Sequence, residues 1–125
     1  MTNHHTTKAY DPINYPEVLE RIGGDTEFLA ELLNIYFLEF QEKKSQIEEA
    51  LEDANFGLIQ EIGHSLKGAS ANLSLPSLRR LASALEAAAR ERDIEMARRA
   101  LGSLVSECRL LHDFLRQNPP ADQRV

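Results

Sequence analysis

The chain contains little of what builds β-sheets or disulfide-linked folds. Its 125 residues include no tryptophan and one cysteine, and only 6% of its side chains are aromatic. Valine is scarce, and no stretch alternates apolar and polar residues with a period of two, so we expect almost no β-strand. The single Cys108 excludes an internal disulfide and fits a reducing compartment. The 42% hydrophobic fraction instead suits helices rich in leucine and alanine.

The sequence also lacks long apolar runs. No run approaches the roughly 18 residues that a membrane-spanning helix needs, and residues 1–10 contain no secretory apolar region. We therefore expect a cytoplasmic protein with no membrane partner.

The net charge of −6 is unevenly distributed. Residues 1–63 hold four basic and thirteen acidic side chains (net −9), whereas residues 64–125 hold ten basic and seven acidic (net +3). Binding of nucleic acid usually needs a far more basic domain, so we expect no nucleic-acid partner. A mildly positive field near His64 and Lys67 would instead attract an acidic protein surface or a phosphoryl group.

The length is that of one domain, large enough to bury a core without disulfides or metals. We expect a disordered tail at residues 1–10, a helical bundle at 11–117 and a loose tail at 118–125. Helical periodicity predicts a short helix at 17–22 and four long ones ending near residues 53, 73, 92 and 117. Short links make consecutive helices antiparallel neighbours. The predicted fold is all-α, an antiparallel up-down four-helix bundle with a short extra N-terminal helix capping one end.

The boundaries of these helices carry recognisable signals. Asp25, Asn55 and Asp93 are good N-caps, Pro76 suits a first helical turn, and Gly23 offers a left-handed C-cap. Each of the four long helices has one apolar stripe predicted to face the core. In chain order the stripes are Leu29, Leu32, Leu33, Tyr36, Phe37, Phe40, Ile47 and Leu51; Leu58, Ile59, Ile62, Leu66, Ala69 and Leu73; Leu78, Leu81, Ala82, Leu85, Ala88 and Ala89; and Met96, Ala97, Ala100, Leu101, Leu104, Cys108, Leu111 and Leu115.

The helix predicted at residues 55–73 places His64 directly away from its apolar stripe. At 100° per residue, Ile62 and Leu66 each lie about 200° from His64, so the imidazole should point into water. Glycine in a helix interior costs roughly 1 kcal/mol relative to alanine. Two glycines on this face therefore suggest that the ring is kept uncovered for a large partner. The neighbours of His64 on the outer face are Gly57, Gln60, Glu61, Lys67, Gly68 and Ala71.

The next helix runs back beside this one and should meet the level of His64 near Leu85 and Glu86. The Glu86 carboxylate would repel an incoming anion unless Lys67 or Arg90 neutralises it. An exposed imidazole is largely neutral and nucleophilic near pH 7. The sequence contains neither a GxxxxGK[ST] loop nor a GxGxxG motif after a strand, so we expect no kinase activity of its own.

Residues 64–73 read HSLKGASANL and resemble the signature of histidine phosphotransfer (HPt) domains. Gly23-Gly24-Asp25 upstream and Leu81 and Leu85 downstream extend the resemblance over most of the chain. The resemblance implies a four-helix bundle whose surface histidine carries a phosphoryl group between receiver-domain aspartates in two-component signal transduction. Ser74 departs from the family, which usually has glycine there, and predicts a different, slightly strained turn.

The resemblance also implies roles and partners. His64 would be the phosphoryl acceptor, and Lys67 would offset the phosphate charge. The partners would be response-regulator receiver domains, of a hybrid histidine kinase and of a downstream regulator, which supply the aspartate and Mg²⁺. The chain would need no cofactor of its own, act stoichiometrically rather than as an enzyme, and be a monomer. The residues expected to dock or orient the partner are Gly57, Gln60, Glu61, Gly68, Ala71 and Glu86.

Three other readings compete with this one. The chain could be a helical module that binds receiver or kinase domains without accepting phosphate. Two departures from the family would allow this: Ser74, and Glu86 at a position where several family members carry glutamine. It could be the dimerisation hairpin of a histidine kinase, although that module usually has glutamate after its histidine. It could also bind a metal, since Cys108 and His112 lie four residues apart; with no second ligand pair we expect no metal site and interpret Cys108 as a packing residue.

Overall fold

The computed structural model describes residues 8 and 10–123, and every regular element within them is helical. The expected all-α class is thus confirmed for this part of the chain. The elements are α1 (Tyr15–Arg21), α2 (Thr26–Glu52), α3 (Phe56–Asn72), α4 (Pro76–Arg90), α5 (Ile94–Gln117) and a short 3-10 helix, η1 (Pro120–Asp122).

The long helices begin at the expected caps. The side chains of Asp25, Asn55 and Asp93 each accept a hydrogen bond from the backbone N–H three residues on, at 3.0, 3.2 and 3.1 Å. Pro76 opens α4, which has no side-chain cap. The first helix starts two residues before the predicted position because Asn14 caps it, and α4 ends two residues earlier than predicted.

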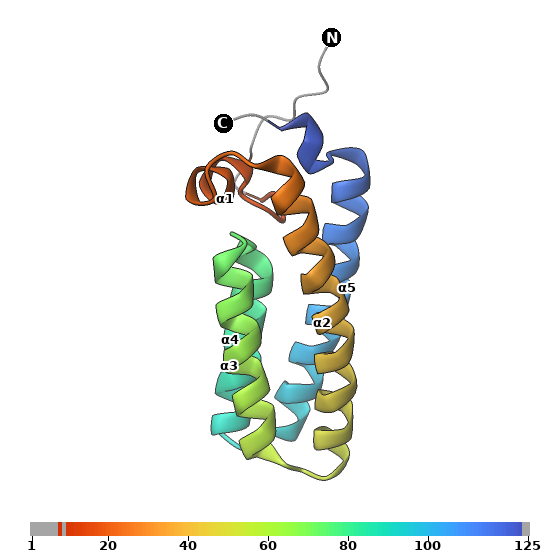
Figure 1. The fold of residues 1–125 in the computed structure, drawn as a ribbon. Coiled ribbons are helices and arrows are strands. Elements are labelled where there is room, and N and C mark those ends of the chain that lie inside the picture. The colour runs from red at the N-terminus through yellow and green to blue at the C-terminus, as the bar shows by residue number, and fades with distance from the viewer. Residues whose placement is uncertain (1–7, 9, 124–125) are drawn as a thin grey trace.

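The helices pack as a chain of neighbours around one core. The closest pair is α3 and α4; α4 also packs on α5, and α2 contacts both α3 and α5. Figure 1 shows α1 lying across the end of the molecule where α3 finishes and α4 begins. The Arg21 guanidinium donates hydrogen bonds to the carbonyl oxygens of Asn72 (2.5 Å) and Ala71 (3.2 Å). These bonds satisfy C-terminal carbonyls of α3 and tie α1 to that end.

Most of the predicted core stripe of each helix is buried or half-buried, but two predictions were wrong. Leu58 is 38% exposed and Met96 is 55% exposed. Both lie in the first turn of their helices, at the end of the molecule opposite α1 (Figure 1). Among residues 10–123, no segment covers that end as α1 covers the other, so helical phase alone overestimated their burial.

The links between helices repeat one backbone motif. In all four, the N–H of one residue bonds the carbonyl five positions earlier, and the preceding N–H bonds the carbonyl three positions earlier. This is the Schellman motif, which places its C′ residue in the left-handed region. Gly23 occupies that position after α1 with φ +78°, but Ala54, Ser74 and Arg92 occupy it in the other three links, with φ +49°, +56° and +56°.

Ser74 therefore keeps the turn that a glycine would make, and the expected different turn was wrong, although the expected strain is present. The surroundings of Ser74 hold it in place. Its hydroxyl donates to Glu17 Oε1 at 2.7 Å, and its carbonyl accepts from the Asn14 N–H at 2.9 Å. The Ser74 hydrogen bond also holds the pKa of the Glu17 carboxyl below its ordinary value. The serine thus joins the α3–α4 link to α1.

Residues 118–123, part of the tail predicted at 118–125, contact the helices in this structure. The Tyr15 hydroxyl donates to the Asn118 carbonyl at 2.5 Å, η1 packs against α2, and the Gln123 side chain is buried. The tail expected at residues 1–10 lies outside the described residues, except Lys8 and Tyr10; the Lys8 N–H donates to Asp11 Oδ2 at 2.8 Å. None of the helices between residues 10 and 123 has an apolar stretch long enough to cross a bilayer.

The left-handed links generate a stability prediction. Replacing Ala54 with glycine should raise the free energy of unfolding by about 1 kcal/mol, because it relieves the clash of a Cβ in the left-handed region. Ser74→Gly should gain less, because it relieves the same strain but loses the hydroxyl bond to Glu17. Urea unfolding of both variants tests this. Equal gains, or no gain for Ala54→Gly, would contradict the account of these turns.

Candidate functional site

His64 stands on the outer face of α3, as predicted. Its side chain is 71% exposed, whereas Ile62 and Leu66, two positions either side, are buried. The helix keeps this phase because its buried residues pack against the core from one side only. The imidazole is therefore accessible to another molecule.

Glu86 of α4 lies beside the imidazole, where the antiparallel register predicted it. Its Oε2 is 3.0 Å from His64 Nδ1, and its Oε1 accepts a hydrogen bond from Lys67 Nζ at 2.8 Å. The Glu86 side chain is only 10% exposed, so most of the carboxylate is enclosed. The carboxylate thus links the side chains that the sequence had placed on one face of α3.

The ionised carboxylate determines which nitrogen of His64 carries the proton. The hydrogen bond from Lys67 is the largest influence on Glu86 and, with that from His64, holds the pKa of its carboxyl below the ordinary 4.5, although burial opposes the shift. An ionised carboxylate can only accept hydrogen bonds. Nδ1 of His64 must therefore be the donor, which leaves the lone pair of the neutral ring on Nε2.

Two cationic side chains, Lys67 and Arg90, lie beside the Glu86 carboxylate. Lys67 is bound to Glu86, and Arg90 NH2 lies 3.9 Å from Glu86 Oε2. The Lys67 side chain is 32% exposed and the Arg90 side chain 58%, so both also reach solvent. The repulsion that a lone carboxylate would exert on a phosphate is therefore countered by one close and one more distant cation.

Gly63 is the site residue that sequence reasoning missed. A Cβ at this position would lie 3.2 Å from the backbone nitrogen of Glu86, 3.3 Å from its Cα and 3.4 Å from the carbonyl oxygen of Ala82. Such contacts are tight against a backbone that cannot easily move, so Gly63 permits the close approach of α3 and α4. The available signal was a third helical glycine, directly before His64 and on the buried side of its helix.

A patch with little side chain adjoins the imidazole on the same face. Gly68 is exposed, and a Cβ added there would meet nothing within 4 Å, so no described part of the chain requires this glycine. At Gly57 a Cβ would meet only Asn55 Oδ1, at 3.8 Å. Of the other predicted contact residues, Glu61 is exposed, and Gln60 and Ala71 are half-buried. They share the face with His64, but none shares a hydrogen bond with it.

Metal chemistry receives no support from the described residues. No group of three or more His, Cys, Asp or Glu side chains among residues 8 and 10–123 is placed to hold an ion. Cys108 is buried, and burial raises the pKa of its thiol to about 11. The adjacent His4 and His5, which could also ligate a metal, lie outside the described part.

The structure is thus an all-helical protein with an exposed histidine on one helix, and comparison with known proteins identifies its family. The Hpt domain family matches residues 31–119, so the chain belongs to the Hpt domain family. Histidine-containing phosphotransfer protein B (HptB) from Pseudomonas aeruginosa PAO1 is similar in structure, with a TM-score of 0.79 and 19% identity over 89% of this chain and 96% of that one.

A second solved structure is also similar. It is the HPT domain of a sensor hybrid histidine kinase from Shewanella, with a TM-score of 0.68 and 20% identity over 85% of this chain and 92% of that one. At these identities the two structures demonstrate a shared fold. No curated protein matches the sequence.

The carboxylate of Glu86 generates a pH prediction. Its pKa is lower in the folded than in the unfolded chain, so the unfolded chain binds more protons as pH falls below about 4.5, and the stabilisation is lost there. The difference in unfolding free energy between wild type and Glu86→Gln should be constant above pH 5 and shrink towards pH 3. Urea unfolding across this range measures it. A difference that stays constant down to pH 3 would show that the ionised carboxylate contributes nothing.

Proposed function

We propose that the chain is a stoichiometric phosphoryl carrier of a phosphorelay, with Nε2 of His64 as the acceptor. The observation that carries the proposal is the exposed imidazole whose Nδ1 lies 3.0 Å from Glu86 Oε2. Membership of the Hpt domain family supports the same role. Ser74 and Glu86 had favoured an interaction module that does not accept phosphate. In the structure Ser74 keeps the turn that a glycine would make, and Glu86 binds His64, so neither residue argues against a phosphoryl carrier.

The transfer step follows from the tautomer. The Nε2 lone pair attacks the phosphorus of a receiver-domain aspartyl phosphate, the bond from phosphorus to the carboxylate oxygen breaks, and the aspartate carboxylate leaves. Nε2 has no proton to release, and Nδ1 keeps its own. The ring therefore gains positive charge, which the Glu86 carboxylate stabilises much as the aspartate stabilises histidine in a catalytic triad. Attack by a second receiver aspartate reverses the step.

Lys67 can neutralise the charge of the phosphoryl group while its hydrogen bond to Glu86 remains in place. A lysine ammonium has three N–H donors, and Glu86 Oε1 takes one of them. The remaining donors are available to phosphoryl oxygens. Phosphoryl transfer depends mainly on such positioning and charge neutralisation. Because the ring binds Glu86 through Nδ1 and phosphate through Nε2, the two anions occupy different edges of the imidazole.

The partners complete the proposal. Receiver domains, of a hybrid histidine kinase upstream and of a regulator downstream, would dock on the His64 face and supply the aspartate and Mg²⁺. The chain would be a cytoplasmic monomer without kinase activity. Its architecture is proposed to be an antiparallel up-down four-helix bundle capped at one end by α1. The contacts of α3 with α4, of α4 with α5, and of α2 with both α3 and α5 support this arrangement. The docking residues are proposed to be Gly57, Gln60, Glu61, Gly68 and Ala71, with Glu86 orienting the acceptor.

Replacing the acceptor tests the assignment directly. Wild-type protein and His64→Gln are incubated with a phosphorylated receiver domain and, separately, with phosphoramidate. His112→Gln is the matched control, because His112 lies on α5 and contacts Phe37 rather than Glu86. Wild type and His112→Gln should gain acid-labile phosphate, His64→Gln should gain none, and ³¹P NMR should place the phosphate on Nε2. Phosphate on His64→Gln, or none on wild type from either donor, would reject the assignment.

A substitution at Gly68 distinguishes docking of a receiver domain from the phosphoryl-transfer step itself. Gly68→Ala should raise the free energy of unfolding by about 0.5–1 kcal/mol, as should the control Gly102→Ala, because each adds a Cβ that meets nothing. Only Gly68→Ala should slow transfer from a receiver domain, and neither variant should slow phosphorylation by phosphoramidate. Equal receiver rates for both variants would show that the bare patch is not a docking surface.

A further inference from the structure

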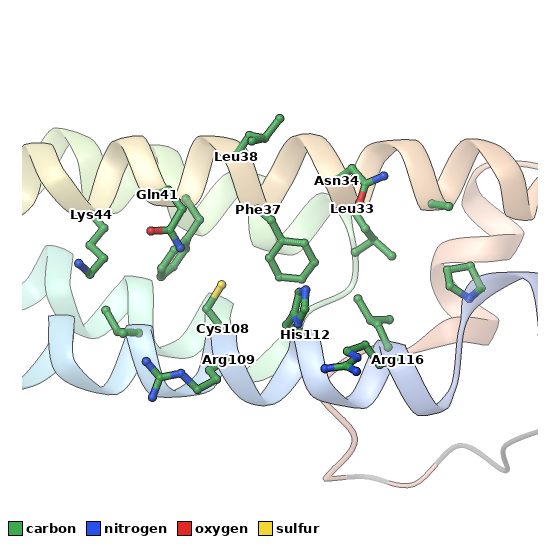
Figure 2. Close-up of a pocket in the computed structure, with 15 residues that line it drawn as sticks. Leu33, Asn34, Phe37, Leu38, Gln41, Lys44, Cys108, Arg109, His112 and Arg116 are labelled. Carbon is green, nitrogen blue, oxygen red and sulfur yellow. The ribbon is translucent and has the colours of Figure 1, made fainter.

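A groove runs between α2 and α5, away from the α3–α4 contact that holds Glu86 against His64. Its volume is about 780 Å³, and side chains from both helices line it (Figure 2). Its apolar floor includes Leu33, Phe37, Val105 and Leu115, of which the last three are only half-buried. The groove exists because α2 and α5 pack less closely than α3 and α4.

One aromatic contact bridges the groove. The Phe37 ring of α2 meets the His112 ring of α5 edge-to-face, with centroids 5.4 Å apart. Figure 2 shows the two rings pointing toward one another from opposite walls. Phe37 thus presents a partly uncovered apolar surface between the helices, the kind of feature into which an apolar side chain of a partner inserts.

The rim of the groove is basic in a chain that is acidic overall. Lys44, Arg109 and Arg116 line it, and no Asp or Glu is among the lining residues. Lys44 is paired with Glu48 at 3.3 Å. Within the described part of the chain, neither guanidinium has a carboxylate within ion-pair distance. These two cations on the edge of an apolar groove are therefore available to an anionic partner.

The spacing of the cations fits a helix. Arg109 and Arg116 are seven residues apart, two turns and roughly 10 Å along α5. An amphipathic helix with acidic side chains seven residues apart would match them while its apolar stripe covers the floor. We propose that this α2–α5 groove binds an acidic amphipathic helix of a partner protein. None of the residues that line the groove belongs to α3 or α4, so we expect a partner to remain bound there while a receiver domain reaches the imidazole.

The test uses a displayed library of helical peptides, randomised on one face and selected against the full chain. Enriched peptides should carry an apolar stripe flanked by Asp or Glu. Their dissociation constants should rise at least tenfold for Arg109→Glu/Arg116→Glu, because attraction becomes repulsion. The control Arg80→Glu/Arg99→Glu makes the same charge change at exposed residues outside the groove and should alter binding less than twofold. Thermal melting verifies that both variants fold.

NMR amide shifts locate the bound peptide. Residues 33–44 and 105–116 should shift, those around His64 should not, and phosphoryl transfer should continue with the peptide bound. The proposal is overturned if no peptide is enriched, if enriched peptides are basic or neutral, or if they bind the His64 face. It is equally overturned if both double variants bind alike, if sedimentation shows that a second copy of the chain fills the groove, or if only small anionic amphiphiles such as dodecanoate bind there.

Discussion

The contact between Glu86 and His64 determines what the exposed face can do. A surface imidazole alone is free to rotate and to exchange its proton between two nitrogens. Here the carboxylate of Glu86, a side chain that is 10% exposed, fixes one nitrogen as donor at 3.0 Å and leaves the other as nucleophile. Lys67 makes the arrangement stable, since an unpaired carboxylate on a largely buried side chain would be costly. Acceptor, orienting anion and neutralising cation form one connected unit.

The rest of the fold holds α3 and α4 in the register that this contact requires. Gly63 brings the two backbones together beside Glu86, and the link at Ser74 returns the chain in a tight left-handed turn. Two residues of α1 hold that end of α3: Glu17 accepts a hydrogen bond from the Ser74 hydroxyl, and Arg21 donates to the carbonyl of Asn72. The strain of a non-glycine residue in the turn is thus offset by hydrogen bonds to α1, whose Tyr15, Val18 and Leu19 are buried in the core.

Local patterns made much of this predictable. The spacing of apolar residues predicted five helices, the caps Asp25, Asn55 and Asp93 predicted the starts of three of them, and helical phase predicted that His64 points outward. Quantities that depend on tertiary distance were not predictable. Periodicity does not reveal whether a helix end is covered, which is why Leu58 and Met96 were misplaced. It does not show how closely helices approach, which is why Gly63 was missed, nor that Lys67 and His64 share one carboxylate.

The most direct test is the protonation of the His64 ring in the unphosphorylated protein. Long-range ¹H–¹⁵N correlation spectra at pH 8 distinguish a protonated ring nitrogen from one that carries a lone pair. In wild type Nδ1 should carry the proton and Nε2 should not, and Glu86→Ala should lose this preference. A wild-type ring protonated on Nε2, or a tautomer unchanged by Glu86→Ala, would contradict the claim that Glu86 prepares His64 to accept a phosphoryl group.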